Sequence, residues 1–474
     1  MSSIGSVKAV EALRGALRLL KARAPELFIF WVGLLLRVSM SWNFKPTWAY
    51  DYWNHVEVAK WMLEHHAVPP SDAMRESFHP PLFYALWATL MKLGVSEKAM
   101  IFVPIVFGTL RLALIWLGLE LYVKDRSARL AGLALAAVCG ASVHLDGMVY
   151  PEALNNLLTT ASMLLGAALF RRQPRKRWRL AAVAGVVLAL SMLTKISAVV
   201  VVLALGTTAL LEFLLARRRI RFRIAAALPL ALTFGVCALG CGWYFARNLV
   251  EHHALFVTSF DLGESVFVAE SNKIPYFLRR PADYVFGWTP AIFYFPYFGS
   301  AIEPRPQFFP VAVVSTFVDY WNYSFFGLEH LVQTPLHVSD GSLLPDVLRA
   351  SQYGALGGTV IFVASTVAWV CAVVVALRRK AFAELSLLLV PPFMLLSALH
   401  FAVKYPVDRY GVVKGVYIQF GAPALFAAFG LAVSWSRKKA DRWPLFGLLL
   451  ASLWCVATYT VYCRLRIPML PVGS

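Results

Sequence analysis

Eleven runs of apolar residues, most of them long enough to cross a lipid bilayer, follow one another along this chain of 474 residues. A helix needs about 20 mostly apolar residues to span the hydrocarbon core, where the backbone must satisfy its own hydrogen bonds. The pattern therefore predicts an all-α polytopic membrane protein with about 11 transmembrane helices. We place the runs at 27–44, 99–122, 128–145, 153–170, 180–194, 196–215, 224–244, 356–377, 383–401, 415–434 and 443–462.

Clusters of lysine and arginine between the runs set the orientation of the helices. Positive charge is enriched on the cytoplasmic side of membrane proteins, and eleven crossings that start inside put every cluster on that side. This agreement requires that 180–194 and 196–215 form a tight hairpin, which turns at Lys195 on the outer side. The net charge of +19 then reflects membrane orientation, and we expect no nucleic-acid partner.

The same pattern predicts how the first half of the chain is organised. Residues 1–26 lack a cleavable signal pattern and place apolar residues at helical spacing between basic ones, which predicts an amphipathic helix on the cytoplasmic face. A transmembrane module follows at 27–244. Its outer loops at 45–98 and 145–152 carry most of the ionisable residues of interest.

The segment 245–355 is too long for a simple connector and is rich in aromatic residues and proline. It predicts an extracytoplasmic cap of short interfacial helices, followed by the C-terminal transmembrane helices at 356–474. Trp288, Trp321 and Tyr323 in the cap have two open interpretations, which are stacking on a ligand ring and anchoring at the membrane interface.

The first outer loop carries acids and imidazoles directly after the first membrane run. Asp51 and His55 are one helical turn apart, and Glu76 and His79 precede the helix-breaking pair at 80–81. Two interpretations remain open at this point. The loop is either a solvated connection whose aspartate caps a helix, or a set of groups gathered at the membrane surface for chemistry.

Two more carboxylates stand in the short outer turn "HLDGMVYPEALNN". Asp146 ends the third run, and Glu152 follows Pro151 at a helix start. Carboxylates are favourable at helix N-termini, so capping explains Glu152 as well as a role in a site does.

Several cations stand on the outer side, against the charge bias. Lys404, Arg409 and Lys414 share one short outer loop, which favours an anionic ligand there. Lys195 is a lone lysine in the turn of an apolar hairpin. Arg247 ends the seventh run after two aromatic residues; it either reaches to the interface from an aromatic belt or binds a lipid phosphate with its guanidinium fork.

Four stretches occur in a characteristic order: Asp51 through "HPPLFYAL", then "MLTKISAVVVVLAL", "WYFARNLV" and "KGVYIQFGAPALFAAFGLA". Together they resemble the GT-C glycosyltransferases, and more narrowly the bacterial members related to the protein O-mannosyltransferases and the lipid A aminoarabinose transferases. The likeness runs from about 27 to 434 and implies the GT-C fold. The chain departs from that pattern at Tyr52, where many relatives carry a second acid, and at Val416, where many carry arginine. The large periplasmic domain of some relatives is absent.

The resemblance implies a polyprenyl-phosphate-linked sugar donor and an inverting transfer to a glycan, lipid or protein acceptor at the extracytoplasmic face. Asp51 would then be the general base, and Glu152 or Asp146 would orient donor or acceptor. Cations would offset charge on the departing lipid phosphate. The expected substrate-binding residues are His55, His79, Glu76, Lys195, Arg247, Asn248, Arg409, Lys414 and Tyr417.

The expected setting is the inner (plasma) membrane of a bacterium, with the active site on the periplasmic side and membrane lipids around the helices. No cofactor is expected, and a divalent metal between Asp51 and a second acid remains the alternative. The six cysteines match neither a zinc site nor a disulfide framework, although a pair between Cys241 and Cys463 stays open. A transporter or flippase for lipid-linked sugars and a scaffold subunit of glycan assembly are the rival functions. The ionisable residues gather at the outer face, and no inverted repeat of the transporter kind is visible.

Overall fold

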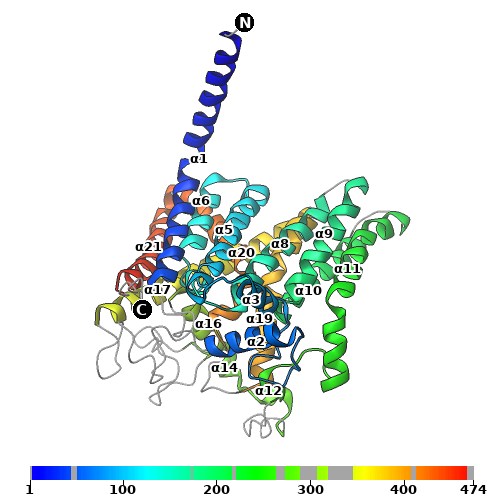
Figure 1. Cartoon of the computed structure of the whole chain (residues 1–474). Helices are drawn as coiled ribbons and strands as arrows, with labels where there is room; N and C mark the ends of the chain where they lie inside the picture. Colours follow the sequence, from blue (N-terminus) through cyan, green and yellow to red (C-terminus); the bar gives the residue numbers. More distant parts are fainter. Residues whose placement is uncertain are drawn as a thin grey trace.

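Over the residues it describes, the computed structural model is helical and contains no strand, as the sequence predicts. These residues are 3–43, 51–171, 174–215, 220–262, 273–288, 307–318, 345–406 and 413–466. Long helices form a bundle, and short helices gather at one end of it (Figure 1). The long helices are α1 (Ser3–Asn43), α5 (Val103–Tyr122), α6 (Arg126–Val138), α8 (Pro151–Arg171), α9 (Pro174–Met192), α10 (Val199–Leu215), α11 (Ile220–His252), α17 (Pro345–Arg379), α19 (Val390–Lys404), α20 (Ala422–Arg437) and α21 (Trp443–Arg466).

Nine helical segments within the described ranges are long and apolar enough to cross a membrane. Each coincides with one of the predicted runs, and their outward faces carry exposed leucine, valine, phenylalanine and tryptophan side chains, as contact with lipid requires. The segments are Lys21–Trp42, Glu97–Tyr122, Pro151–Arg171, Ile196–Leu215, Ala227–His252, Pro345–Arg379, Phe382–Lys404, Gly415–Arg437 and Ala440–Tyr462.

The two remaining predicted runs are also helical. The run at 180–194 lies in α9, which packs between α8 and α11. The run at 128–145 is two helices, because the chain leaves α6 at Cys139 in an extended conformation and re-enters a helix as α7 (Gly140–Leu145). Every residue of α7 is buried. The predicted hairpin at 180–215 is present, with a turn through Lys195 and η2 (Ile196–Ala198) before α10.

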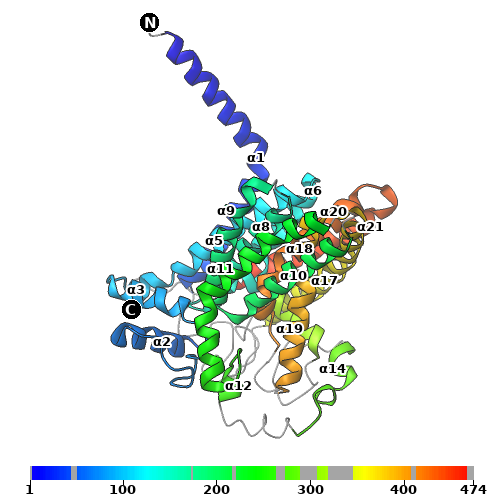
Figure 2. The same cartoon turned by 90° about the vertical axis from the view of Figure 1, so that its right-hand side faces the viewer.

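The N-terminal segment is helical but is not a separate helix. α1 continues through Pro25 from Ser3 to Asn43 without a break. Its first half stands clear of the bundle in both side views (Figures 1 and 2).

The described parts of 245–355 differ from one another. Three short helices, α12 (Ser259–Leu262), η3 (Tyr276–Leu278) and α14 (Ala282–Phe286), carry exposed residues at the end of the bundle that also holds α2. α16 (Phe308–Phe317) is not interfacial, because all of its residues except Phe309 are buried. It packs against α7, α17 and the turn η4 (Gly415–Gly421), as expected for ten residues of which eight are apolar.

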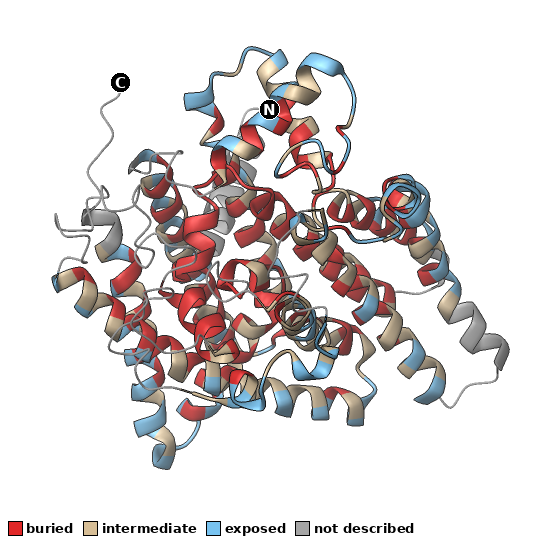
Figure 3. Cartoon of the chain, turned by 90° about the horizontal axis from the view of Figure 1, so that it is seen from below, coloured by how far each residue is buried: buried red, intermediate tan, exposed pale blue. Residues whose placement is uncertain are grey.

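The buried apolar residues form two clusters, and the centre of the bundle is the most buried part of the molecule (Figure 3). The first cluster extends over α5, α6 and α21, and the second extends over α9, α10 and α19. Both include η4, because Val416 belongs to the first while Ile418 and Phe420 belong to the second. η4 therefore lies at the seam between the two halves of the bundle.

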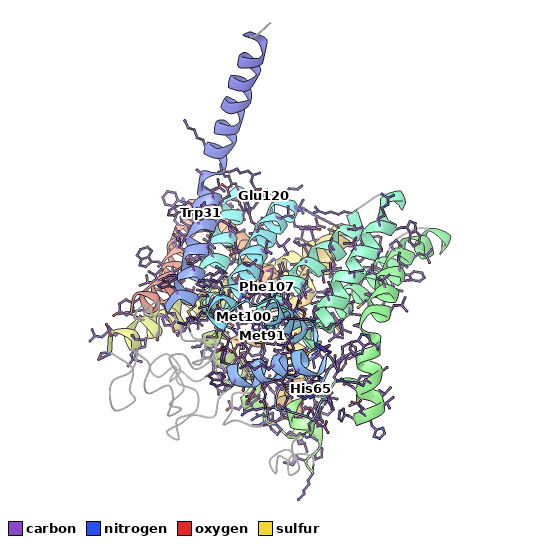
Figure 4. The ribbon with its side chains drawn as sticks, viewed as in Figure 1. Trp31, His65, Met91, Met100, Phe107 and Glu120 are labelled. Carbon is purple, nitrogen blue, oxygen red and sulfur yellow. The ribbon has the colours of Figure 1, made fainter. Side chains whose placement is uncertain are left out.

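One end of the bundle, which we call the outer end, holds the first outer loop. This loop contains α2 (Tyr52–His65), α3 (Leu82–Lys92) and the short α4 (Glu97–Met100), and α2 and α3 project from the bundle as a lobe in Figure 2. Figure 4 places His65, the last residue of α2, at the opposite end of the molecule from Glu120 near the end of α5. The sequence predicts the same separation.

Candidate active site

Four segments that are distant in the sequence meet at the outer end. The backbone N–H of Leu82 donates a 2.9 Å hydrogen bond to the carbonyl of Leu193, which ties the first outer loop to the turn after α9. The backbone N–H of Asp51 donates a 2.8 Å hydrogen bond to the hydroxyl of Tyr150, which ties the same loop to the start of α8. The fourth segment is η4. The ionisable groups predicted on separate loops are thus brought to one place.

Asp51 directly precedes α2, but its side chain makes no capping hydrogen bond. Its carboxylate accepts a 3.4 Å hydrogen bond from Asn54 and lies 3.8 Å from the guanidinium of Arg75. Burial, and next the negative charge of Glu76, raises the pKa of Asp51 to about 6. A carboxylate that titrates just below neutral pH is well matched to general-base chemistry.

Glu76 is the second acid of this loop, and it is buried. Burial raises the pKa of Glu76 to about 7, and the charge of Glu152 adds to the effect. Its carboxylate lies 3.2 Å from Nε2 of His79. Burial, and next the charge of Lys195, lowers the pKa of His79 to about 3, so this imidazole is neutral. A neutral imidazole beside such a carboxyl group forms a pair that can hold a proton at neutral pH.

His55 contacts the residues that hold both acids. Its Nδ1 is 2.9 Å from the hydroxyl of Tyr84, and its ring lies edge-on to that of Tyr150, with 4.7 Å between centroids. Tyr84 donates to the carbonyl of Glu76 at 3.3 Å, and Tyr150 accepts from the Asp51 backbone. Burial lowers the pKa of His55 well below its usual range. His55 is therefore a neutral element of the framework that positions the two acids.

A carboxylate and two lysines complete the cluster. Glu152, at the start of α8, forms an ion pair with Nζ of Lys195, while its Oε2 is buried without a hydrogen-bond partner. Nζ of Lys195 lies 5.1 Å from the centre of the Tyr417 ring, and Nζ of Lys414 lies 5.6 Å from the same centre. The two cations therefore approach one aromatic ring of η4.

Lys414 is the more deeply buried of these two lysines, with 6% of its surface exposed. Burial lowers the pKa of Lys414 well below its usual range, whereas the charges of Asp51 and Glu152 oppose that shift. The ammonium group is thus most stable next to an anion. An anionic ligand bound here would raise the pKa of Lys414 and so stabilise its charged form.

Arg247 and Asn248, at the outer end of α11, hold the first outer loop in place. The guanidinium of Arg247 donates 3.0 Å hydrogen bonds to the carbonyl of Pro69 and to the hydroxyl of Ser71. Ser71 in turn donates to Oδ1 of Asn248 at 3.2 Å. Both residues therefore lie at the same end of the bundle as Asp51. Their predicted contact with substrate stays a prediction, and their described hydrogen bonds are to the loop.

Asp146 makes its described contacts in the interior of the bundle. Its Oδ2 accepts a 2.7 Å hydrogen bond from Nε of Arg37, and both side chains are almost completely buried. Gly108 of α5 faces the carboxylate so closely that a Cβ there would overlap it. The catalytic role predicted for Asp146 stays a prediction, and the structure assigns it a buried ion pair with the first membrane run.

Several residues of this region escaped the sequence interpretation. The sequence does single out Arg37, because an arginine in the middle of an apolar run marks a functional or paired group. Arg111 in α5 had the same signal. Tyr84 and Tyr150 had none, because buried tyrosines are common in any core. Arg409, Trp321 and Tyr323 lie outside the described residues.

In the part of the chain that the structure describes, the grouping of side chains does not support a metal site. There, no set of three histidine, cysteine, aspartate or glutamate side chains is arranged to hold a metal ion. The expectation that no cofactor is used stays a prediction.

Comparison with known proteins adds a family match over part of the chain and a shared fold. Residues 78–243 match the model of the dolichyl-phosphate-mannose-protein mannosyltransferase family. No curated protein sequence matches the chain. Among solved structures, the chain is similar to the oligosaccharyltransferase AglB from Archaeoglobus fulgidus in complex with an inhibitory peptide and a dolichol-phosphate, with a TM-score of 0.55 and 13% identity over 96% of this chain and 57% of that one.

A second structure of the Archaeoglobus fulgidus oligosaccharyltransferase, tethered to an acceptor peptide, gives a TM-score of 0.57 and 14% identity over 94% of this chain and 55% of that one. The chain thus spans a little over half the length of these structural neighbours. This chain therefore shares its fold with these solved structures. Its segment 78–243 is similar to the dolichyl-phosphate-mannose-protein mannosyltransferases.

Proposed function

We propose that this protein transfers a sugar from a polyprenyl-phosphate carrier to an acceptor at the extracytoplasmic face of the membrane, with inversion at the sugar carbon. One observation carries the proposal. A partly buried carboxylate with a pKa near 6, Asp51, lies at the outer end together with two lysines that approach one aromatic ring, Lys195 and Lys414. A base and an anion-binding pair are the two parts that such a transfer needs.

The reaction follows from these groups. The acceptor hydroxyl gives its proton to Asp51 as its oxygen forms a bond to the sugar C1. The bond between C1 and the phosphate oxygen breaks on the opposite face, and its electron pair stays on the lipid phosphate. Lys195 and Lys414 offset the negative charge that develops there. Attack and departure on opposite faces give the inverted product.

The protonation states agree with this assignment. At pH 7 a carboxyl group with a pKa of about 6 is mostly ionised, so Asp51 is ready to accept a proton. Lys195 is paired with Glu152 before the donor arrives. Burial disfavours the charged form of Lys414, and a nearby anion stabilises that form. A lipid phosphate therefore completes a charge arrangement that is already assembled.

The donor class is supported by the neighbours as well. The matched family takes its name from a mannose carried on dolichyl phosphate, and one structural neighbour holds a dolichol-phosphate. We infer a polyprenyl phosphate carrier for this chain, in the inner membrane of a bacterium. The acceptor is a hydroxyl group of a glycan, a lipid or a protein.

The direct test is mass spectrometry of lipids that co-purify with the protein, followed by single-turnover transfer from the carrier that is found. Asp51→Asn should keep the lipid and lose transfer. Unchanged transfer by Asp51→Asn would reject the assignment of the base. A wild-type protein that binds the carrier but never transfers sugar would instead indicate a scaffold or a flippase.

Sidedness has its own test. Asp72 is exposed on the first outer loop, so Asp72→Cys should react with a membrane-impermeant thiol reagent added to spheroplasts. Reaction only after the membrane is opened would place the loop in the cytoplasm and reject the proposed orientation.

A further inference from the structure

A second group of buried polar side chains lies inside the bundle, beneath the candidate active site. It consists of Arg37, Arg111, Asp146, Ser142 and Gln419, each with 2% or less of its surface exposed. Most of their polar atoms are hydrogen-bonded, while Nε of Arg111 and Oδ1 of Asp146 have no partner among the described residues. These side chains come from α1, α5, the α7 region and η4. Burying such groups within a membrane bundle is unfavourable unless they are hydrogen-bonded, and a group of this kind warrants a functional explanation.

The bonds within this group end on η4. Nη1 of Arg111 donates a 3.2 Å hydrogen bond to the hydroxyl of Ser142, and Nη2 donates to the backbone carbonyl of Gln419. Ser142 donates a 2.7 Å hydrogen bond to Oε1 of Gln419. Arg111 thus holds η4 directly through the backbone and indirectly through the Gln419 side chain.

The other end of η4 is fixed as well. Nε2 of Gln419 donates to the carbonyl of Gly415 at 3.3 Å, and the N–H of Gly415 donates to the hydroxyl of Ser315 in α16 at 2.6 Å. A Cβ at Gly415 would overlap the backbone of α16, so this close approach requires glycine. Tyr417 lies between the fixed residues Gly415 and Gln419, and Lys414 directly precedes Gly415.

Arg37 and Asp146 complete the support. Their ion pair joins α1 to the chain just after α7, and Arg37 also donates to the carbonyls of Gly33 and Ala137. α7 carries Ser142, so this pair fixes the helix that presents the bridging hydroxyl. The whole group therefore acts on η4 from the interior side.

We propose that Arg111, through Ser142 and Gln419, is a positioning residue that sets the place of Lys414 and Tyr417 in the candidate active site. The group does not touch substrate, and its effect on the reaction passes through η4. As a statement about the lipid phosphate the proposal rests on the proposed function, whereas as a statement about the position of Lys414 it does not.

The test compares two buried serine-to-alanine changes. Ser142→Ala removes the bridging hydroxyl, while Ser365→Ala, in α17, removes a buried hydroxyl that has no hydrogen-bond partner. Both are mild changes that the fold should tolerate. Gln419→Leu and Arg111→Lys extend the series on the network side.

The first measurement needs no ligand. In a Lys414→Cys background, the rate at which a small neutral thiol reagent modifies position 414 is followed by mass spectrometry of that peptide. Ser142→Ala should change this rate by about threefold or more. Loss of the Ser142 hydrogen bond loosens η4, and this changes how often the chain opens near position 414. Ser365→Ala should leave it unchanged. An unchanged rate in Ser142→Ala and Gln419→Leu would overturn the proposal.

The second measurement is the affinity for a polyprenyl phosphate. Ser142→Ala should weaken binding by about fivefold, and the loss should largely disappear when Lys414→Met is already present, because the two residues then act on one interaction. Fully additive losses would mean that Ser142 is only structural, and would also overturn the proposal. If wild-type protein binds no polyprenyl phosphate, the proposed function fails, and the labelling rates still decide the positioning role.

Discussion

The molecule has two groups of buried or partly buried charges, and they differ in what they are able to do. The outer group has three acids, Asp51, Glu76 and Glu152, and two lysines, Lys195 and Lys414. The interior group has two arginines and one acid, Arg37, Arg111 and Asp146. The outer group includes two acids, Asp51 and Glu76, whose pKa values lie near neutrality. The guanidinium groups of the interior group are anchored to helix carbonyls, a carboxylate and a hydroxyl.

This difference separates chemistry from support. A group that exchanges protons needs pKa values near the working pH, whereas a group that joins helices needs strong bonds between them. Removing a charge should therefore have opposite consequences in the two places. In the outer group it should reduce turnover and leave the fold intact, and in the interior group it should destabilise the fold.

Asp51→Asn should give the largest effect on activity. The variant cannot accept the acceptor's proton, and general-base catalysis contributes roughly 10²–10⁴-fold to a rate. We expect kcat to fall by about that factor, while affinity for the carrier lipid and the melting temperature in detergent stay close to wild type. Asn54→Ala removes only the long hydrogen bond to Asp51 and serves as the matched control. Loss of folded protein in Asp51→Asn would mean that Asp51 belongs with the supporting charges.

Asp146→Asn should act in the opposite way. It leaves the Arg37 guanidinium buried without its counter-charge, and breaking one partner of a buried ion pair typically costs about 3–5 kcal/mol. A clear drop in melting temperature, measured at a fixed scan rate, is the expected result. Asp125→Asn keeps a capping acceptor at the start of α6 and should change the melting temperature little. Normal stability with lost transfer would support the catalytic role that the sequence predicts for Asp146.

The ion pair of Asp146 with Arg37 is a contact that the sequence alone did not predict. The apolar runs and the charge clusters predicted the membrane helices, and the hairpin at Lys195 followed from charge bias alone. The convergence of Asp51, Glu76, Glu152 and Lys414 was also predicted, since all lie on outer loops. Whether an acid at the end of a helix turns toward the site or the interior depends on packing, and periodicity does not report packing.

Packing also explains two further differences between the predicted and the observed structure. A break at Cys139 divides the third run, although no proline or glycine pair precedes it to give a signal. α16 is buried rather than interfacial because its neighbours α7, α17 and η4 enclose it, and those contacts join residues far apart in the chain. Arg247 was predicted to bind phosphate from its charge and place. The structure adds that its guanidinium is bonded to Pro69 and Ser71.

The lysines of the outer group should give a smaller effect than Asp51. Lys195→Met and Lys414→Met each remove one cation from the proposed phosphate site, and a hydrogen bond to a charged group contributes roughly 1.5–3 kcal/mol. We expect the affinity for a polyprenyl phosphate to weaken by about 10–100-fold in either variant. Lys404→Met is the matched control, because Lys404 is at the same end of the bundle but pairs with Asp261 at 2.9 Å. An equal loss in all three variants would point to a general charge effect and not to a site.

The pH profile of transfer should give the smallest effect and the finest distinction. Activity requires ionised Asp51, so kcat/KM for the wild type should rise with pH through about 6. Glu76→Gln removes the charge that is the second cause of the raised pKa of Asp51, so the acid limb should move to lower pH. Burial, the first cause, remains, and Glu76, with a pKa of about 7, is itself mostly protonated near pH 6, so the shift should be at most about half a pH unit. Glu97→Gln, an exposed acid paired with Lys60, should leave the limb in place. A limb that moves to higher pH in Glu76→Gln would show that the two acids do not share one electrostatic environment, and the outer group would then no longer be a single site.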